Sequence, residues 1–297
     1  MTENTAATHE GKNTDSKSTN ESSQEVFAMD TYMTVTAYGK NAKKAVDASI
    51  AEIKRLDELL STGDEDSEIA KLNVNKSATL SEDGGYLVQR GIELSTMTDG
   101  AFDIAIYPVM QEWGFPTKDF KVPDDATLKE LLKLADVSKI DYDNKSREIS
   151  FEDACMEIDL GGIAKGYTSS RIMDIFKEYD VDSGLVNLGG NVQTYRTKTD
   201  GSKWRVAVQS PEDESQYIGV VDVSDKAVIT SGGYERYFEQ DGKIYHHIID
   251  PATGYPAESG LKSVTIVSDD GTLADGLSTS LFIMAVSYTH LRAHETR

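Results

Sequence analysis

The order of periodic segments along this chain constrains its fold more than any other feature. Apolar residues recur every three or four positions through much of the first half, whereas short, β-rich alternating segments fill most of the second half. Helices and strands do not alternate regularly, as a doubly wound parallel sheet would require. We therefore predict an α+β fold with mixed, largely antiparallel sheets and flanking helices.

Residues 41–61 carry the strongest helical pattern, with apolar side chains at Val46, Ile50, Ile53, Leu56 and Leu60. A strand is predicted over residues 26–39, and residues 140–152 are expected to form a hairpin that turns at Asp143–Lys145. A loop is expected at residues 159–166. Further helices are predicted at residues 83–98, 126–135, 166–179 and 272–285. Strands are predicted within residues 184–195, 204–210, 217–224, 227–239, 243–251 and 262–268.

The two ends of the chain differ in composition from the rest. Residues 1–25 are rich in Ser, Thr, Asn and Glu, and such a stretch buries too little apolar surface to offset the entropy of ordering. We predict a disordered polar leader there, one folded domain over residues 26–286, and an unstructured or foreign tail over residues 287–297. His290 and His294 lie four residues apart in this tail, so a metal-binding helix is the alternative.

Charge and cysteine content exclude several classes of function. The formal net charge of −21 argues against a nucleic-acid groove or an anionic membrane surface as partner, so no nucleic-acid partner is expected. An acidic chain that handles phosphates needs a metal ion or backbone dipoles. The single Cys155 excludes an internal disulfide, a four-thiolate zinc site and a conventional iron–sulfur cluster. No stretch approaches eighteen consecutive apolar residues, so no transmembrane helix is expected in this chain.

Five glycine-containing segments indicate a ligand cleft. Each on its own is typical of a tight turn, but several lie beside Asp or His, and glycine lets the backbone approach a ligand closely. None has the order of a P-loop, and no G-x-G-x-x-G follows a strand. The segments are GAFDIAIYP (100–108), DLGGIAKGY (159–167), LVNLGGN (185–191), ITSGGYERYF (229–238) and HHIIDPATGYP (246–256).

Asp275 and Thr279 lie four residues apart, so a helix would place both side-chain oxygens on one face near its N-terminus. One carboxylate, one hydroxyl and a carbonyl from a glycine loop would suit Mg²⁺, which also takes oxygen atoms from water and substrate phosphate. The alternative is that Asp275 caps the helix and that Thr279 has no role.

The two histidines of IYHHIIDP point to opposite faces if the segment is a strand, so only one can face a given site. His247 immediately precedes the apolar pair before an Asp-Pro turn. Both a structural and a catalytic role are open for it. No G-x-S-x-G motif is present, so a serine hydrolase of that type is not indicated.

Taken together, these segments resemble the FAD:protein FMN transferases of the ApbE family. The resemblance runs from about Met29 to Ala285 and rests on nine stretches in the family's order. They are MDTYMTV, STGDEDSEIAKLN, GAFDIAIYPVMQEWGF, DLGGIAKGY, LVNLGGN, WRVAVQSP, ITSGGYERYF, HHIIDPATGYP and SVTIVSDDGTLADGLSTSLF.

The resemblance implies an enzyme that uses Mg²⁺ to transfer FMN from FAD to a threonine or serine hydroxyl of an acceptor flavoprotein, with release of AMP. Two alternatives stay open: a Mg²⁺-dependent FAD pyrophosphatase that yields FMN and AMP, and a non-enzymatic FAD-binding protein. Members of the family are commonly exported, so we expect a lipoprotein at the outer face of the cell membrane, although no signal or lipidated cysteine is visible; the alternative is a cytoplasmic protein.

Carried over by position, the family's site residues fall on eleven positions. The resemblance assigns metal binding to Asp275, Thr279 and the carbonyl of Gly162, and makes His247 the acceptor of the hydroxyl proton; Asp275 and His247 are thus the expected catalytic residues. The implied flavin contacts are Met29, Ala101, Phe102, Asp103, Asp159, Lys165 and Ile249.

Overall fold

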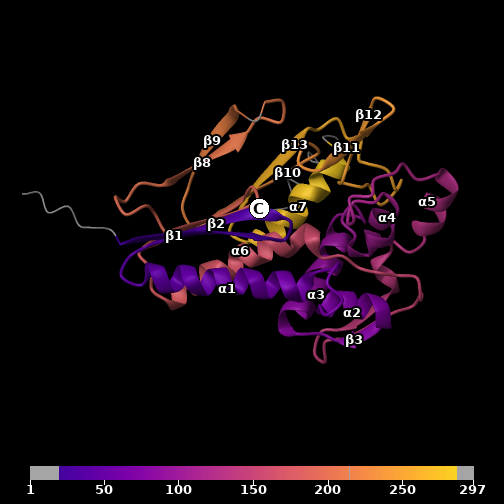
Figure 1. Cartoon of the computed structure of the whole chain (residues 1–297), viewed down its shortest axis with the longest axis horizontal. Helices are drawn as coiled ribbons and strands as arrows, with labels where there is room; N and C mark the ends of the chain where they lie inside the picture. The colour runs from indigo at the N-terminus through magenta and orange to yellow at the C-terminus, as the bar shows by residue number, and fades with distance from the viewer. Residues whose placement is uncertain (1–19, 214, 286–297) are drawn as a thin grey trace, which may run out of the picture.

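The computed structural model describes residues 20–213 and 215–285. Most of the predicted leader and the whole predicted tail, with the pair His290 and His294, lie outside the described residues, and those interpretations stay predictions. Figure 1 shows helices gathered against a central sheet, with smaller hairpins at the periphery.

The central sheet has six strands in the order β1-β2-β6-β7-β10-β13, and every neighbouring pair is antiparallel. Three smaller antiparallel sheets accompany it: β3-β5-β4, β8-β9 and β11-β12. This arrangement confirms the predicted α+β class. The central strands are β1 (Glu21–Ala28), β2 (Thr31–Tyr38), β6 (Ser183–Leu188), β7 (Asn191–Tyr195), β10 (Ala227–Gly232) and β13 (Ser263–Ser268). The others are β3 (Ser77–Thr79), β4 (Ile140–Asp143), β5 (Glu148–Phe151), β8 (Trp204–Gln209), β9 (Tyr217–Val223), β11 (Tyr237–Gln240) and β12 (Lys243–His246).

Three long helices cover one face of the central sheet: α1 (Ala42–Leu60), α6 (Gly161–Glu178) and α7 (Gly271–Met284). Alternate side chains of β10 pack against different elements on the two faces of the sheet. Ala227 and Ile229 pack with Ala274 of α7, whereas Val228 points to the opposite face and packs against the base of the β8–β9 hairpin. The remaining helices are α2 (Glu68–Asn75), α3 (Glu82–Met97), α4 (Tyr107–Glu112) and α5 (Asp125–Leu131), with 3-10 turns η1 (Ile104–Ile106) and η2 (Val137–Lys139).

The N-terminal strand prediction was wrong in two respects. Residues 26–39 form parts of two strands, because the chain turns at Met29 and Asp30, whose φ angles are +48° and +59°. The first of these strands also begins earlier, at Glu21, so residues 21–25 belong to the sheet and not to a disordered leader. β1 is an edge strand whose side chains are mostly exposed, and its polar residues therefore resemble a linker.

Residues 159–166 were predicted as a loop, but α6 begins at Gly161, so most of the segment DLGGIAKGY is helical. Its glycines allow two close contacts. A Cβ at Gly162 would lie 2.9 Å from the ring of Phe102, and a Cβ at Gly166 would lie 2.2 Å from the carbonyl oxygen of Gly271 on α7. The neighbouring residues leave no room for side chains at these two positions, which explains the glycines without an irregular backbone.

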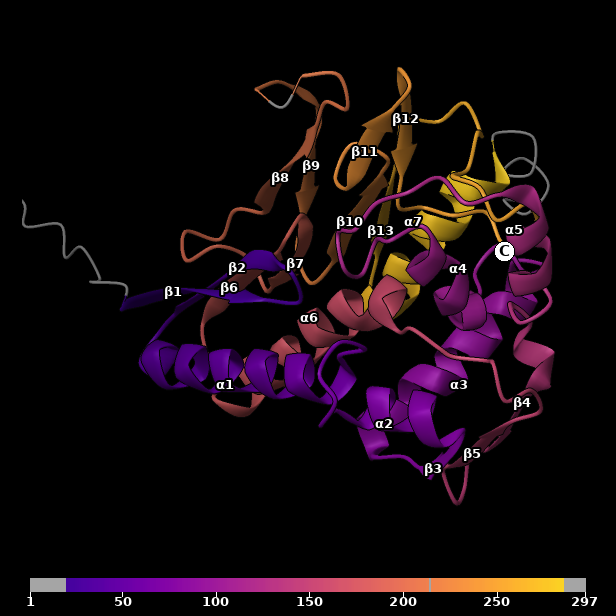
Figure 2. The same ribbon diagram turned by 45° about the vertical axis from the view of Figure 1, so that its right-hand side comes forward.

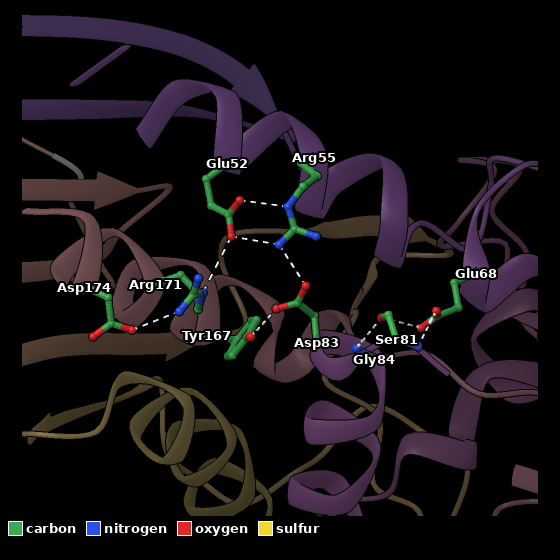
Figure 3. A network of polar contacts seen from close by, with 9 residues as sticks. All are labelled: Glu52, Arg55, Glu68, Ser81, Asp83, Gly84, Tyr167, Arg171 and Asp174. Carbon is green, nitrogen blue, oxygen red and sulfur yellow. Dashed lines mark hydrogen bonds and ion pairs between the residues drawn. The ribbon is translucent and has the colours of Figure 1, made fainter. Parts of the chain in front are cut away.

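A polar network fixes α6 against α1 and α3 (Figure 3). Arg55 of α1 binds Glu52 and Asp83, both at 2.8 Å. The hydroxyl of Tyr167 on α6 donates to Asp83, and Arg171, one turn further on, lies 3.6 Å from Glu52. The helix that begins at DLGGIAKGY is therefore held along its length by charged side chains from two other helices.

Candidate functional site

A cavity of about 1140 Å³ lies between the turn that joins β1 to β2, the first turns of α6, one side of α7 and the segments that follow β10 and β12. It is large enough for a dinucleotide-sized ligand. All eleven residues predicted for the site line this one cavity: Met29, Ala101, Phe102, Asp103, Asp159, Gly162, Lys165, His247, Ile249, Asp275 and Thr279.

Asp275 and Thr279 extend from the same face of α7 into the cavity. Asp275 is only 5% exposed, and its carboxylate accepts hydrogen bonds from the Gly166 amide at 2.8 Å and from Asn191 Nδ2 at 3.0 Å. Burial raises its pKa, and the nearby charge of Lys165 opposes that shift. The alternative that Asp275 caps the helix is wrong, because the residue that caps α7 is Asp270, which accepts from the Leu273 amide at 2.9 Å.

The first turn of α6 faces α7 across the cavity wall. Gly162 lies in this turn, and the amide one helical turn later, that of Gly166, donates to Asp275. Asp159 precedes the helix and accepts a hydrogen bond from the Gly161 amide at 2.9 Å, while burial raises its pKa. The start of α6 thus lies next to two carboxylates, Asp159, which is partly buried, and Asp275, which is buried, and Lys165 adds the positive charge.

The segment before α4 forms another part of the wall. Asp103 caps η1 by accepting from the Ala105 amide at 2.7 Å, and burial raises its pKa to about 6. Phe102 packs its ring on Gly162. On the opposite side, the amide of Met29 donates to Asp57 at 2.9 Å, which holds the β1–β2 turn in its left-handed conformation.

Only one of the two histidines lines the cavity, as predicted, but His247 lies just after β12 and not in the strand that the sequence analysis expected. His246 does not line the cavity. Its Nε2 lies 3.2 Å from the Ala257 carbonyl oxygen, and its ring packs against Phe282. His247 lines the cavity just after β12 ends. Its Nδ1 lies 3.2 Å from the carbonyl oxygen of Arg236, which can only accept, so Nδ1 carries the proton and Nε2 is left as an acceptor. His247 is partly buried, and this burial, with help from the Arg236 charge, lowers its pKa to about 3.

Comparison with known proteins places these residues in a family. Residues 29–295 match the model described as the ApbE family. The chain belongs to the ApbE family. It is 36% identical over 240 residues to the FAD:protein FMN transferase of Klebsiella pneumoniae (strain 342), covering 79% of this chain and 73% of that protein. It is 33% identical over 285 residues to the FAD:protein FMN transferase of Treponema pallidum (strain Nichols), covering 89% and 79%.

Solved ApbE structures share the fold as well. The crystal structure of the ApbE protein from Thermotoga maritima is 32% identical, covers 93% of this chain and 91% of its own, and superposes with a TM-score of 0.87. The apo form of the flavinyl transferase ApbE from Pseudomonas stutzeri is 30% identical, covers 90% and 85%, and has a TM-score of 0.80. In the part of this ApbE chain that the structure describes, no helix is long and apolar enough to cross a membrane.

The ApbE cavity also contains polar residues that the sequence analysis did not single out. Asn191 holds Asp275, and Glu235 lies near Lys165 and Asp275, with a pKa raised by burial and by the Asp275 charge. Arg236 extends toward the β1–β2 turn, where its Nη2 lies 3.8 Å from Asp30. All three cavity residues lie in the segments LVNLGGN and ITSGGYERYF, which were noted only for their glycines.

Among the described residues, no group of three or more His, Cys, Asp and Glu side chains is arranged to hold a metal ion. The metal ligands predicted for this ApbE chain are not such a group, because they are one carboxylate, one hydroxyl and one backbone carbonyl. Its three residues line the same cavity, and their role as metal ligands stays a prediction.

Proposed function

We propose that this chain uses Mg²⁺ to transfer FMN from FAD to a serine or threonine hydroxyl of an acceptor flavoprotein, with release of AMP. Membership of the ApbE family makes the chain an enzyme of flavin transfer. The observation that carries the finer proposal is the single cavity that gathers His247, Lys165 and the oxygen atoms around Asp275.

The transfer is a phosphoryl-type displacement. The acceptor's hydroxyl oxygen forms a bond to the phosphorus of the FMN phosphate, while the bond from that phosphorus to the bridging pyrophosphate oxygen breaks. AMP leaves with the bridging oxygen and its electron pair. The hydroxyl proton passes to Nε2 of His247, whose Nδ1 is held by the Arg236 carbonyl.

The residues around Asp275 fit a magnesium ion. Asp275 is a buried carboxylate whose oxygens accept from two neutral donors, an amide nitrogen of the main chain and one of a side chain. A cation beside it would offset the cost of burying its charge. The Thr279 hydroxyl and the Gly162 carbonyl would add hard oxygen ligands of the kind that Mg²⁺ prefers. Bound there with FAD, Mg²⁺ would neutralise negative charge on the two phosphates.

The electrostatics of His247 suit a proton acceptor that acts only when substrate is present. With a pKa of about 3, the free imidazole is neutral at physiological pH, so its Nε2 lone pair is available. It is also a weak base. The negative phosphates of bound FAD would favour the protonated ring and raise this pKa toward the range in which a general base is effective.

Mass spectrometry of a candidate acceptor domain, incubated with the chain, FAD and Mg²⁺, tests the proposal. We expect the acceptor to gain one FMN group for each AMP released. Asp275→Asn should abolish the Mg²⁺-dependent reaction, because the variant loses a charged ligand. The matched control is Asp270→Asn on the same helix, which should keep the activity because asparagine caps helices as well as aspartate does.

Two results would favour the alternatives. An unchanged acceptor mass, while AMP and FMN accumulate, would indicate a Mg²⁺-dependent FAD pyrophosphatase. FAD that stays bound and intact with Mg²⁺ and acceptor present would indicate a non-enzymatic FAD-binding protein.

The proposal extends to location. We place the protein at the outer face of the cell membrane as an exported lipoprotein, and the resemblance to commonly exported family members is its support. Fractionation of cells that express the natural gene would test this; recovery of the protein in the cytoplasm would contradict it.

A further inference from the structure

We propose that the acceptor protein docks by adding an extended segment as a third strand to the free edge of β9, beside the cavity. The inference rests on the proposed transferase function, and it names the surface that receives the protein substrate. Figure 2 shows the β8–β9 hairpin projecting from the sheet on the side away from α1 and α3.

The free edge of β9 is long and apolar. Within the described residues, β8 and β9 form a sheet of only two strands, so one side of β9 pairs with no strand. Tyr217, Ile218 and Val220 are 67%, 64% and 49% exposed. An unpaired edge of this kind is a template for another chain, and proteins usually protect such edges with lysine, proline or polar residues.

One outer strand of the central sheet, β1, differs from β9 because it begins with the polar run Glu21–Glu25. β9 has no lysine and no proline, and its one charged residue, Asp222, lies 3.6 Å from Arg205 of the neighbouring strand. The base of the hairpin is already packed, because Val206 and Val223 form a buried cluster with Val228. The exposed apolar surface is therefore confined to the half of β9 nearest the hairpin tip.

This half of β9 lies next to one residue of the cavity wall. Tyr217 pairs across the hairpin with Gln209, which lines the cavity. The register shifts at this point, since Val208 pairs with Gly219 and Ile218 has no partner. Such bulges redirect side chains and are frequent next to active sites. Tyr237 of the β11–β12 hairpin also lines the cavity. It is 52% exposed, so its ring is a further apolar surface at the cavity.

The chemistry of the reaction defines the occupant. The acceptor hydroxyl must reach a phosphate inside the cavity, whereas the rest of the acceptor stays outside. An extended segment meets both needs, because main-chain hydrogen bonds to β9 would hold it and alternate side chains would point either to the apolar edge or toward the cavity. The expected partner is therefore a flavoprotein segment with apolar residues next to its serine or threonine.

Kinetics of acceptor modification test the surface. The probes are the acceptor domain that the parent chain flavinylates and a synthetic peptide of its modified segment. Val220→Lys should raise the KM for the acceptor at least tenfold and leave FAD affinity unchanged. The control is Val267→Lys on β13, an outer strand of the central sheet, where the valine has a similar exposure of 46%. It should behave as the parent.

A second measurement does not depend on any variant folding. Peptides N-methylated at alternate residues lose main-chain donors, so strand addition predicts that one of the two methylation patterns is a poor substrate for the parent enzyme. Equal rates for both patterns, or parental kinetics for Val220→Lys, would overturn the docking site while the transferase stands. A Val220→Lys variant that abolishes a dimer of the parent without changing acceptor kinetics would assign the edge to self-association instead. A parent chain that modifies no acceptor removes the proposed function and this inference together.

Discussion

Gly166→Ala tests whether the close approach of α6 and α7 creates the site. A Cβ at this position would lie 2.2 Å from the backbone oxygen of Gly271 and 2.7 Å from Cβ of Asp275. Ordinary contact begins at 3.4 Å, so the helices must separate locally by 3.4 − 2.2 = 1.2 Å. Neither neighbour is the flexible end of a side chain, so the backbone has to move.

Two effects should follow from this separation. Overpacking of a rigid contact costs about 1–3 kcal/mol, and about 2–4 °C is lost per kcal/mol in a domain of this size. We therefore expect the melting temperature to fall by about 2–12 °C. The same movement lengthens the 2.8 Å bond from the Gly166 amide to Asp275. The Mg²⁺ concentration for half-maximal transfer should rise roughly tenfold, a loss of about 1.4 kcal/mol in binding.

Calorimetry and a Mg²⁺ titration of FMN transfer, well below the lower melting temperature, measure the two effects. Gly219→Ala is the stability control, because nothing lies within 4 Å of a Cβ there, and it should melt at or up to about 4 °C above the parent. If Gly166→Ala melts as the parent does and keeps its Mg²⁺ requirement, the contact between the helices does not determine the metal site.

Three further predictions concern side chains at and near the site. His247→Asn should slow single-turnover AMP release by about a hundredfold to ten-thousandfold, whereas His246→Asn should keep the parental rate, and the reverse order would contradict the assignment of the base. Because the folded-state pKa of His247 is lowered to about 3, its neutral form stabilises the fold fully above the unfolded value near 6.5. Between pH 6.5 and pH 4 the parent should therefore lose more stability than His247→Asn does in urea unfolding, and parallel curves would contradict this. Tyr167→Phe removes the hydroxyl that donates to Asp83 and should lower the free energy of unfolding by about 1 kcal/mol in the same assay, while an unchanged midpoint would show that the network in Figure 3 adds no stability through this bond.

Some features of the fold could be predicted without the structure because one element carries its own signal. The amphipathic pattern of α1 and the helix around Asp275 were predicted within one or two residues, since burial of one helix face requires that spacing. The hairpin of β4 and β5 was likewise predicted from its turn residues. The sequence also predicted that only one of His246 and His247 faces the site, although His247 lies just after β12 ends, so strand alternation is not what separates them.

Other features depend on contacts between distant parts of the chain. Periodicity could not show that β1 begins at Glu21, because an exposed edge strand has few buried residues to reveal it. The glycines at the start of α6 suggested a loop, and only the neighbouring Phe102 and Gly271 explain why a helix carries them.

The residue types of the site, and their place near glycines, were determined by the sequence alone. Their arrangement was not. Asp275 becomes a buried, hydrogen-bonded carboxylate only where the Gly166 amide, 109 residues away along the chain, reaches it. Asn191 approaches the same carboxylate from another strand, 84 residues away. Local sequence determines which face of an element is apolar, but long-range packing decides which polar groups meet at the end of the sheet, and that meeting creates the cavity.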